Sequence, residues 1–335
     1  MKFSAGYQYK NSGELFCEII ADYREHIAEV YFAFPGFASG RPDGALNNSE
    51  ALEQLGYELS EIKAMNIKLN LLINGNCYGK DAVSEKFYGE IAAVLEKMDR
   101  AGMLPEIVTT TSPFAAYAIR KLAPAIDIRA SVNMRIDSLK AIDYLAESFD
   151  SFYLRRDLQR NLATVAKFAE HCRKLDKKLC LLANSGCLYN CPYQTFHDNM
   201  VSHDSELRQQ QNNRDFIPHL CWQRYKGGEN MADFLRSSWL RPEDIHKYEP
   251  YCHTMKLATR QHSHIRLVLA AYCSGRFDGN VLDLTEPCIA QAFAPKILDN
   301  RLLDGVELPG SCCDRECGDC GKCEEILKKA VRSLF

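Results

Sequence analysis

Cysteine is the residue type whose spacing in this chain points most directly to chemistry. Near the C-terminus, Cys317, Cys320 and Cys323 are separated by two residues each, and Cys312 and Cys313 lie just ahead of them. Gaps of this size let consecutive thiolates converge on one metal centre. The pattern predicts a four-cysteine site. The even CxxCxxC spacing favours an iron–sulfur cluster, and zinc is the alternative in this tail.

A second group of thiols follows a short apolar run at 179–183 that predicts a buried strand. Cys187 and Cys191 come directly after this run, and Cys221 lies further along. Three thiols are one short of a closed cluster site, and the fourth ligand stays open between Cys252, His197, His203 and a tail cysteine. Three here and five in the tail make the eight that two 4Fe–4S clusters need, with Cys312 or Cys313 completing the first. Alternatively, an open iron binds substrate as a Lewis acid.

The remaining cysteines lie in apolar runs and are interpreted as buried small side chains. They are Cys17, Cys77, Cys172, Cys180, Cys273 and Cys288. Disulfides are not needed for folding, because 335 residues with 46% apolar content are enough for a large core. The net charge of −3 argues against a strongly basic nucleic-acid surface. No secretory signal and no apolar run of about 18 residues is visible, so we expect a cytoplasmic protein without a membrane segment.

Alternating strand-like and helix-like segments must position these thiols. Eight such units in one chain predict an α/β fold, a closed (β/α)8 TIM-type barrel with catalytic loops after each strand. We expect a barrel over 1–299, an insert at 189–251 on the catalytic face after strand seven, and a cysteine-rich iron–sulfur tail over 300–335. The predicted strands are 2–7, 29–34, 67–73, 106–110, 126–132, 151–154, 178–183 and 254–257. The predicted helices are 14–25, 49–65, 85–101, 112–122, 138–147, 162–175 and 262–272.

Polar residues that end these strands are the predicted substrate contacts. We assign catalytic or binding roles to Asn133, Arg155, Lys256 and Arg260, since arginine binds a carboxylate or phosphate bidentately. Lys256 lies within a predicted strand, where a buried charge needs a partner. The alternative for it is an ion pair with Asp157. No GxSxG, HExxH or P-loop sequence occurs, so serine, zincin and nucleotide-hydrolase chemistry have no support.

The order of several motifs resembles the peptidase U32, or collagenase-like, family. The matching segments are Ser131-Val132-Asn133, Arg155-Arg156-Asp157, Ser185-Gly186-Cys187, Pro242-Glu243-Asp244-Ile245 and Lys256-Leu257-Ala258-Thr259-Arg260. The resemblance implies a TIM-type barrel and a 4Fe–4S cluster held after strand seven, with Cys187, Cys191 and Cys221 as ligands. Three features depart from the family pattern: the short gap between the first two cysteines, the absence of cysteine at 242–245, and the cysteine-rich tail.

The resemblance also implies an activity. Better-understood relatives look like oxygen-independent hydroxylases of quinone precursors or RNA bases. We therefore expect an iron–sulfur oxidoreductase that acts on a small anionic molecule, a peptide or an RNA base, with an electron donor or partner protein. The alternatives are a non-enzymatic iron–sulfur scaffold or maturation partner and, ranked lower, a peptidase, for which the sequence shows no nucleophile–base pair.

Overall fold

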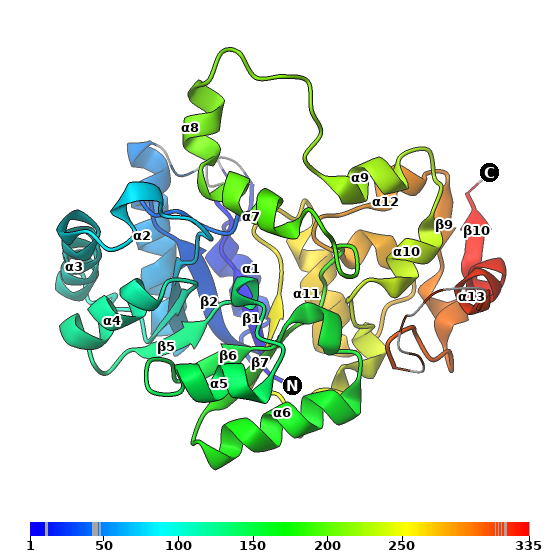
Figure 1. Cartoon of the computed structure of the whole chain (residues 1–335), viewed down its shortest axis with the longest axis horizontal. Coiled ribbons are helices and arrows are strands. Elements are labelled where there is room, and N and C mark those ends of the chain that lie inside the picture. Colours follow the sequence, from blue (N-terminus) through cyan, green and yellow to red (C-terminus); the bar gives the residue numbers. More distant parts are fainter. Residues whose placement is uncertain are drawn as a thin grey trace.

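Eight parallel strands form a closed barrel in the computed structural model of the chain (Figure 1). The structure describes residues 1–10, 13–41, 46, 48–311, 313, 315, 317 and 320–334. Strand β8 pairs with β1 to close the barrel, with Lys256 opposite Ser4. The strands are β1 (Phe3–Gly6), β2 (Ile27–Ala33), β3 (Lys68–Ile73), β4 (Ile107–Thr110), β5 (Asp127–Ala130), β6 (Ser151–Tyr153), β7 (Lys178–Leu182) and β8 (Thr254–Leu257). The predicted (β/α)8 fold is confirmed.

Helices follow the strands, as the apolar periodicity predicts. Several begin at a capping side chain that accepts a hydrogen bond from a backbone N–H of the first turn, as Ser112 does in α4 and Asn161 in α6. The barrel helices are α1 (Phe16–Asp22), α2 (Ser49–Ala64), α3 (Glu85–Arg100), α4 (Pro113–Leu122), α5 (Leu139–Leu145), α6 (Leu162–Lys174) and α11 (Ile265–Ser274). None of the described helices is both long and apolar enough to cross a bilayer.

The segment between β7 and β8 is built from short helices rather than from an independent sheet. Helix α8 and the chain leading to α9 project from the body of the molecule (Figure 1). The helices of this insert are α7 (Gln194–Ser202), α8 (Asp204–Gln209), α9 (Leu220–Tyr225), α10 (Met231–Arg236) and η5 (Pro242–Tyr248).

The chain beyond the barrel returns to pack on the insert. Strand β10 pairs antiparallel with β9, so residues on either side of position 300 share one small sheet. These two strands and α13 lie on the opposite side of the molecule from α3 and α4 (Figure 1). The elements are η6 (Val281–Leu284), α12 (Ala290–Phe293), β9 (Lys296–Leu298), η7 (Asn300–Leu303), α13 (Lys322–Ala330) and β10 (Val331–Ser333).

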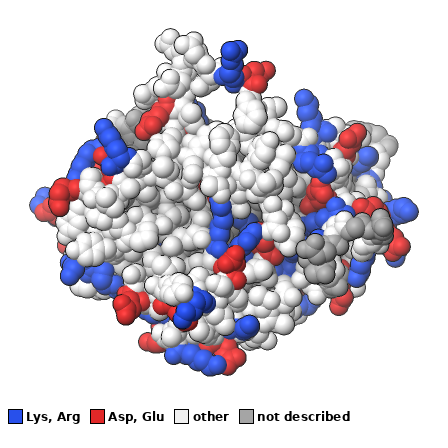
Figure 2. Space-filling model, in the orientation of Figure 1, with Lys and Arg blue, Asp and Glu red and all other residues white. Residues whose placement is uncertain are grey.

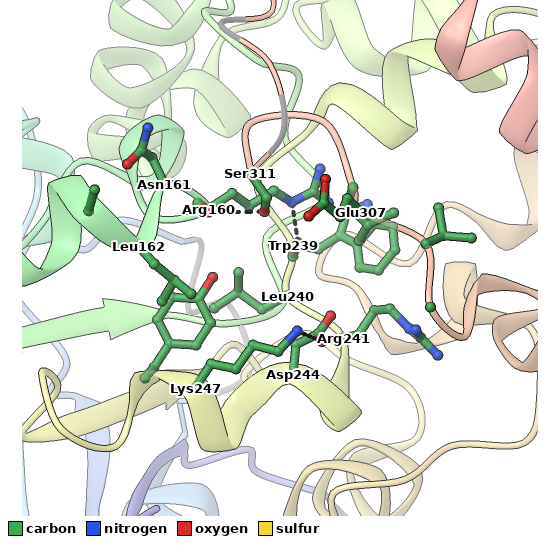
Figure 3. A pocket seen from close by; sticks show the side chains of 15 residues that line it. Arg160, Asn161, Leu162, Trp239, Leu240, Arg241, Asp244, Lys247, Glu307 and Ser311 are labelled. Atoms are coloured by element: carbon green, nitrogen blue, oxygen red, sulfur yellow. Dashed lines mark hydrogen bonds and ion pairs between the residues drawn. The ribbon is translucent and has the colours of Figure 1, made fainter.

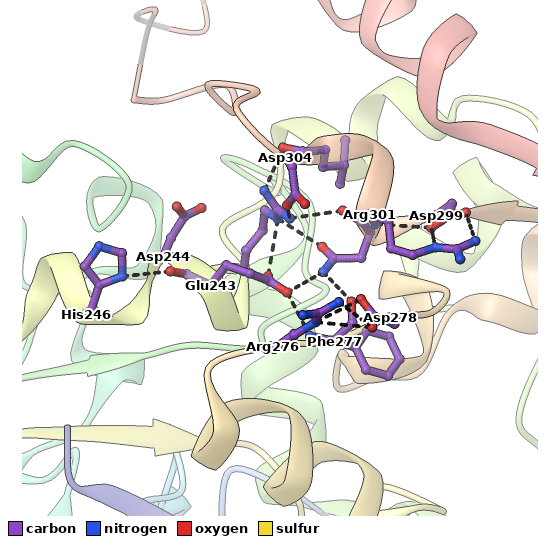
Figure 4. Close-up of polar contacts among 12 residues, drawn as sticks. Glu243, Asp244, His246, Arg276, Phe277, Asp278, Asp299, Arg301 and Asp304 are labelled. Carbon is purple, nitrogen blue, oxygen red and sulfur yellow. Dashed lines mark hydrogen bonds and ion pairs between the residues drawn. The ribbon is translucent and has the colours of Figure 1, made fainter.

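A buried arginine just before η5 joins this element to η7. Figure 4 shows polar contacts in this region, with Glu243 and Asp304 among the labelled residues. The Arg241 guanidinium donates to the carbonyl oxygens of Leu303 at 2.6 Å and Asn300 at 3.0 Å, and pairs with Asp304. The Asn300 amide in turn donates to Glu243 at 2.9 Å. Because Arg241 and Asn300 are buried, their hydrogen bonds avoid the desolvation cost of an unpaired group. The start of the predicted tail is thus fixed to the insert.

The lower part of the barrel interior is polar. Glu29 accepts hydrogen bonds from Asn70 at 3.1 Å and from Arg129, and Arg129 also donates to Ser151 at 3.0 Å. The residues next to these along each strand face outward into the main apolar core, as alternation along a strand requires. We call the following set the lower layer: Ser4, Glu29, Asn70, Thr109, Arg129 and Ser151, all buried.

Candidate functional site

Lys256 lies in the barrel one layer above Arg129. Its ammonium nitrogen is 3.9 Å from the ring centroid of Tyr31 and 5.8 Å from that of Tyr153. The alternative ion pair with Asp157 is not formed, because the Asp157 carboxylate accepts from Arg155 and Ser238. Burial, reinforced by the nearby Arg260, lowers the pKa of Lys256 to about 7. A lysine with this pKa is able to accept or donate a proton near neutral pH.

Arg260 and Arg41 extend this positive region toward the loop after β2. Arg260 donates to the Ser39 hydroxyl at 2.8 Å and to the Arg41 carbonyl at 3.3 Å. Gly6 makes room for it, since a Cβ there would lie 2.7 Å from the Arg260 Cγ. The Arg41 guanidinium is 3.4 Å from the buried Glu286 carboxylate. Glu286 is thus the carboxylate that partly neutralises the barrel mouth.

The two arginines after β6 have different surroundings. Arg155 is already engaged, with Asp137, Asp157 and Asn190 as partners at 3.2, 3.1 and 2.6 Å. The buried Arg156 instead points to the thiol group, and its guanidinium is 3.0 Å from Cys187 Sγ. Arg156 is therefore a candidate that the sequence analysis passed over in favour of its neighbour.

Asn133 lies in the 3₁₀ turn η3 (Val132–Met134) that follows β5. Its carbonyl oxygen is 3.4 Å from the Asn76 amide, so the loops after β3 and β5 meet here. Figure 2 shows a small group of Lys and Arg side chains, with Asp and Glu beside them, near the middle of this face, while most other charged side chains lie around its rim.

Cys187, Cys191 and Cys221 are half-buried and share one neighbourhood beside Arg156. Burial and the negative charge of the Cys187 thiolate raise the pKa of Cys191, and the same two causes raise that of Cys221 to about 12. Thiols that repel one another's charge in this way suit a cation placed between them. In the described part of the chain, however, no three Cys, His, Asp or Glu side chains converge closely enough to hold a metal ion. The donor types nevertheless fit an iron–sulfur site.

Comparisons with known proteins bear on the fold and not on the cysteines. The protein named "Uncharacterized protease MJ1657" from Methanocaldococcus jannaschii is 26% identical over 316 residues, which cover 92% of this chain and 90% of that protein. The solved structure of the U32 peptidase Mk0906 superposes with a TM-score of 0.55 at 12% identity, covering 78% of this chain and 94% of the other. No protein-family model matches the sequence. The chain is thus similar over most of its length to a protein named a protease, and it shares the fold of a U32 peptidase.

The candidates for a fourth ligand lie in three different places. Cys252 is buried, and its thiol is 3.1 Å from the Thr254 carbonyl oxygen at the start of β8. His203 lies beside Cys77 instead. His197 is the histidine close to Arg156, and burial together with His219 lowers its pKa to about 4. A neutral imidazole is the form that binds metal, so His197 is favoured over His203 as a ligand.

The tail cysteines are only partly described by the structure. Cys312 lies outside the described residues, Cys313, Cys317 and Cys320 are exposed, and Cys323 is buried at the start of α13. Burial raises the pKa of Cys323, and Arg236 and Cys317 lie close enough to influence it. Whether these thiols share one centre stays a prediction.

Three arginines around the tail, the buried Arg160 and Arg315 and the half-buried Arg236, each keep one buried nitrogen without a hydrogen-bond partner. These atoms are Arg160 Nη2, Arg236 Nε and Arg315 Nε. Arg315 stacks over Tyr189 at 4.4 Å and donates to the Asp157 carbonyl oxygen, which ties the tail to the barrel mouth. Arg160 also lines a cavity of about 560 Å³ between α6, η5 and the returning chain (Figure 3). Buried arginine nitrogens without partners favour an anionic group nearby, such as a cluster bound by thiolates.

The structure also corrects one interpretation. Cys17, Cys172 and Cys180 are buried as predicted, whereas Cys77, Cys273 and Cys288 are only half-buried. Cys77 lies beside His203. The two residues are 126 positions apart, so local spacing gave no signal for their meeting. The sequence analysis therefore missed a thiol–imidazole pair.

Proposed function

We propose that this chain, which resembles the peptidase U32 family, binds an anionic small molecule, or an acidic group of a peptide or RNA base, in its barrel mouth and modifies it by iron–sulfur chemistry. The observation that carries the proposal is the placement of Lys256, Arg260, Arg41 and Arg156 on the same rim as three cysteines. Loops at the C-terminal ends of barrel strands are where the catalytic residues of this fold gather.

The residues of the chain divide the work in this proposal. Arg156 and Arg260 hold the anionic group of the substrate, while Lys256 accepts or returns a proton because its pKa is about 7. Cys187, Cys191 and Cys221 would hold a 4Fe–4S cluster, with His197 or a tail cysteine as fourth ligand. When bound, the cluster supplies electron transfer or a Lewis-acid iron.

The tail would hold the second metal site. Cys312, Cys313, Cys317, Cys320 and Cys323 supply enough thiols for one further 4Fe–4S cluster, with zinc as the alternative. The partnerless nitrogens of Arg236 and Arg315 support an anionic cluster there, because guanidinium groups would balance its charge. A tail cluster would relay electrons from a donor protein to the mouth. If the tail holds zinc, the scaffold role becomes the better reading.

Metal analysis tests the cofactor. Protein purified and reconstituted without oxygen is analysed for iron, sulfide and zinc, and by EPR, as wild type and as the Cys187→Ser, Cys221→Ser and Cys317→Ser variants. We expect Cys187→Ser and Cys221→Ser to lose one cluster and Cys317→Ser to lose the other. Cys273→Ser, in α11, is the matched control and should keep all iron. Iron content that is unchanged in every variant would contradict the proposal.

Anion binding tests the substrate site without any metal. Citrate added to the full chain should raise the thermal unfolding temperature, since a ligand that binds only the folded state stabilises it by mass action. Lys256→Met and Arg260→Met should abolish the citrate effect. Lys247→Met is the control, because Lys247 pairs with Asp244 at 2.6 Å outside the mouth. If citrate raised the unfolding temperature of all variants equally, citrate would not bind in the barrel mouth.

A further inference from the structure

Cys77 and His203, which have no role in the proposed function, meet in a cavity that shares Ser39 and Arg41 with the barrel mouth. The cavity has a volume of about 350 Å³. One wall is the loop after β3, which carries Cys77 and Tyr78, and another is the junction between α7 and α8, which carries His203 and Glu206. Phe37 and Phe87 supply an apolar wall.

Hydrogen bonds fix the loop after β3 against the end of α7. The Ser202 hydroxyl accepts from the backbone N–H of Asn76 at 2.7 Å and of Cys77 at 3.3 Å, and donates to the Asp198 carbonyl oxygen at 3.0 Å. Ser202 is the last residue of α7, so this contact places His203 directly over the Cys77 loop. The loops therefore present thiol and imidazole from fixed backbone positions.

The imidazole has a carboxylate on its other side. His203 Nδ1 is 3.2 Å from Glu206 Oε2, one turn further along the chain. Gly79 has a positive φ of 54°, and a Cβ there would lie 3.7 Å from His203 Cε1. The backbone of Gly79 thus passes close to the ring while the exposed Glu206 orients it.

The electrostatics of the two side chains shift both of them toward their ionised forms. The His203 imidazole, together with the Gly79 N–H, lowers the pKa of Cys77, and the Cys77 thiolate with Glu206 raises that of His203. The half-buried Cys273 shows the opposite behaviour, because burial raises its pKa to about 12. A thiolate rather than a thiol is the nucleophilic form of cysteine.

We propose that Cys77 is the nucleophile of an acyl-transfer site, with His203 as its acid–base partner and Glu206 as a positioning residue. This is a site for an amide or ester whose acyl side chain is apolar, because Phe37, Tyr78 and Phe87 line the cavity. The arrangement of nucleophile, base and orienting carboxylate is the one that thiol-dependent acyl transfer requires. It is independent of the metal sites in the mouth and tail.

The chemistry balances without any further reagent. The Cys77 sulfur bonds to the acyl carbon, the bond from that carbon to the leaving amine or alcohol breaks, and the leaving group takes the proton of the His203 imidazolium. Water then attacks the thioester and gives a proton to His203. The carboxylic acid leaves, and the thiolate–imidazolium pair is restored.

Two measurements on the full-length protein test this site. In the first, iodoacetamide is applied at about pH 6.5 and each cysteine peptide is quantified by mass spectrometry. We expect Cys77 to react at least about tenfold faster than glutathione, whose thiol is mostly protonated at this pH, and faster than Cys273. His203→Gln should remove this excess. His171→Gln is the matched control, because His171 pairs with Asp143 at 2.7 Å on the surface without a thiol.

In the second, the 4-nitrophenyl ester of N-acetylphenylalanine serves as the probe, with that of N-acetylglycine for comparison. We expect a burst of 4-nitrophenolate, an acyl adduct on the Cys77 peptide and a preference for the phenylalanyl ester. Cys77→Ser should abolish the adduct, and His203→Gln should slow acylation about 100-fold or more. In Glu206→Gln the alkaline limb of the pH–rate profile should move to lower pH, since the His203 pKa falls. An adduct absent from Cys77, or alkylation unchanged in His203→Gln, would overturn the proposal.

Discussion

Two cationic side chains lie one layer apart inside the barrel, and their surroundings differ. Arg129 in the lower layer has a buried carboxylate, Glu29, and hydroxyl and amide groups around it. Lys256 above it has two aromatic rings and lies near Arg260 and Arg41. Tyr153 separates them, with Arg129 at 5.6 Å and Lys256 at 5.8 Å from its ring.

Arg129 and Lys256 also differ in how easily they stay charged. Burial opposes ionisation of both members of the lower pair, yet each holds the other charged: the pKa of Glu29 is lowered and that of Arg129 is raised. In Lys256 burial prevails and the pKa falls to about 7. Charges that are compensated inside the protein serve the fold, whereas a cation left to rings and like charges is better suited to a substrate anion.

Breaking the lower pair should have the largest effect on stability. Arg129→Met leaves the Glu29 carboxylate buried without its ion pair, and we expect a loss of about 3–5 kcal/mol in the free energy of unfolding. Urea denaturation measures it. The double variant Glu29→Met with Arg129→Met should recover part of the loss, because no charge then remains buried. A loss below about 1 kcal/mol in the single variant would show that this pair stabilises the fold no more than a surface ion pair does.

Removing Lys256 should change the pH dependence of stability. In the unfolded chain its pKa is about 10.4, so between about pH 7 and pH 10 the unfolded state binds more protons and stability rises with pH. Lys256→Met lacks this contribution. We expect the variant to exceed wild type at pH 6 by on the order of 1–3 kcal/mol, with the advantage shrinking toward pH 10. A pH-independent difference would contradict the low pKa.

Glu286→Gln should also change the pH dependence of stability, by less than Lys256→Met does. The Glu286 carboxylate raises the pKa of Lys256 against burial and Arg260, so its removal should lower that pKa further. The rise in stability should then begin below pH 7, shifted by less than about one pH unit. Unfolding free energies across pH 5–10 measure the shift. In the double variant with Lys256→Met no shift should remain, which separates an effect on Lys256 from one on Arg41.

The barrel itself was predictable from the sequence. Each strand is a short apolar run, and each helix repeats its apolar residues at helical spacing behind a cap such as Ser112 or Asn161, so local preference and tertiary packing agree. The lower layer was harder to predict. Glu29 and Arg129 look like ordinary charged residues in strands that are 100 positions apart, and only closure of the barrel brings them together.

The candidate site was predictable only where one strand end carries it. Lys256 and Arg260 follow from alternation along β8, and Cys187 follows from the end of β7. After β6 the chain enters the 3₁₀ turn η4 (Arg156–Leu158), which turns Arg156 rather than Arg155 toward Cys187. Cys77 and His203 meet because the insert folds back over the loop after β3. No local pattern encodes such a contact between distant loops.

Lys178→Met should have the smallest effect on the free energy of unfolding, and it serves as the surface comparison for the buried pair of Glu29 and Arg129. Lys178 is partly exposed and 2.7 Å from Asp127, which also accepts from Ser151. An ion pair with one exposed partner contributes less than about 1 kcal/mol. Burial raises the pKa of Asp127, but hydrogen bonds from Lys178 and Ser151 outweigh burial and lower it. The stability that these hydrogen bonds contribute is therefore present above about pH 4 and is lost as the pH falls further. Wild type and variant should therefore differ slightly at pH 7 and converge in acid. Urea denaturation at both pH values measures this, and a loss as large as that of Arg129→Met would erase the distinction between buried and surface charge.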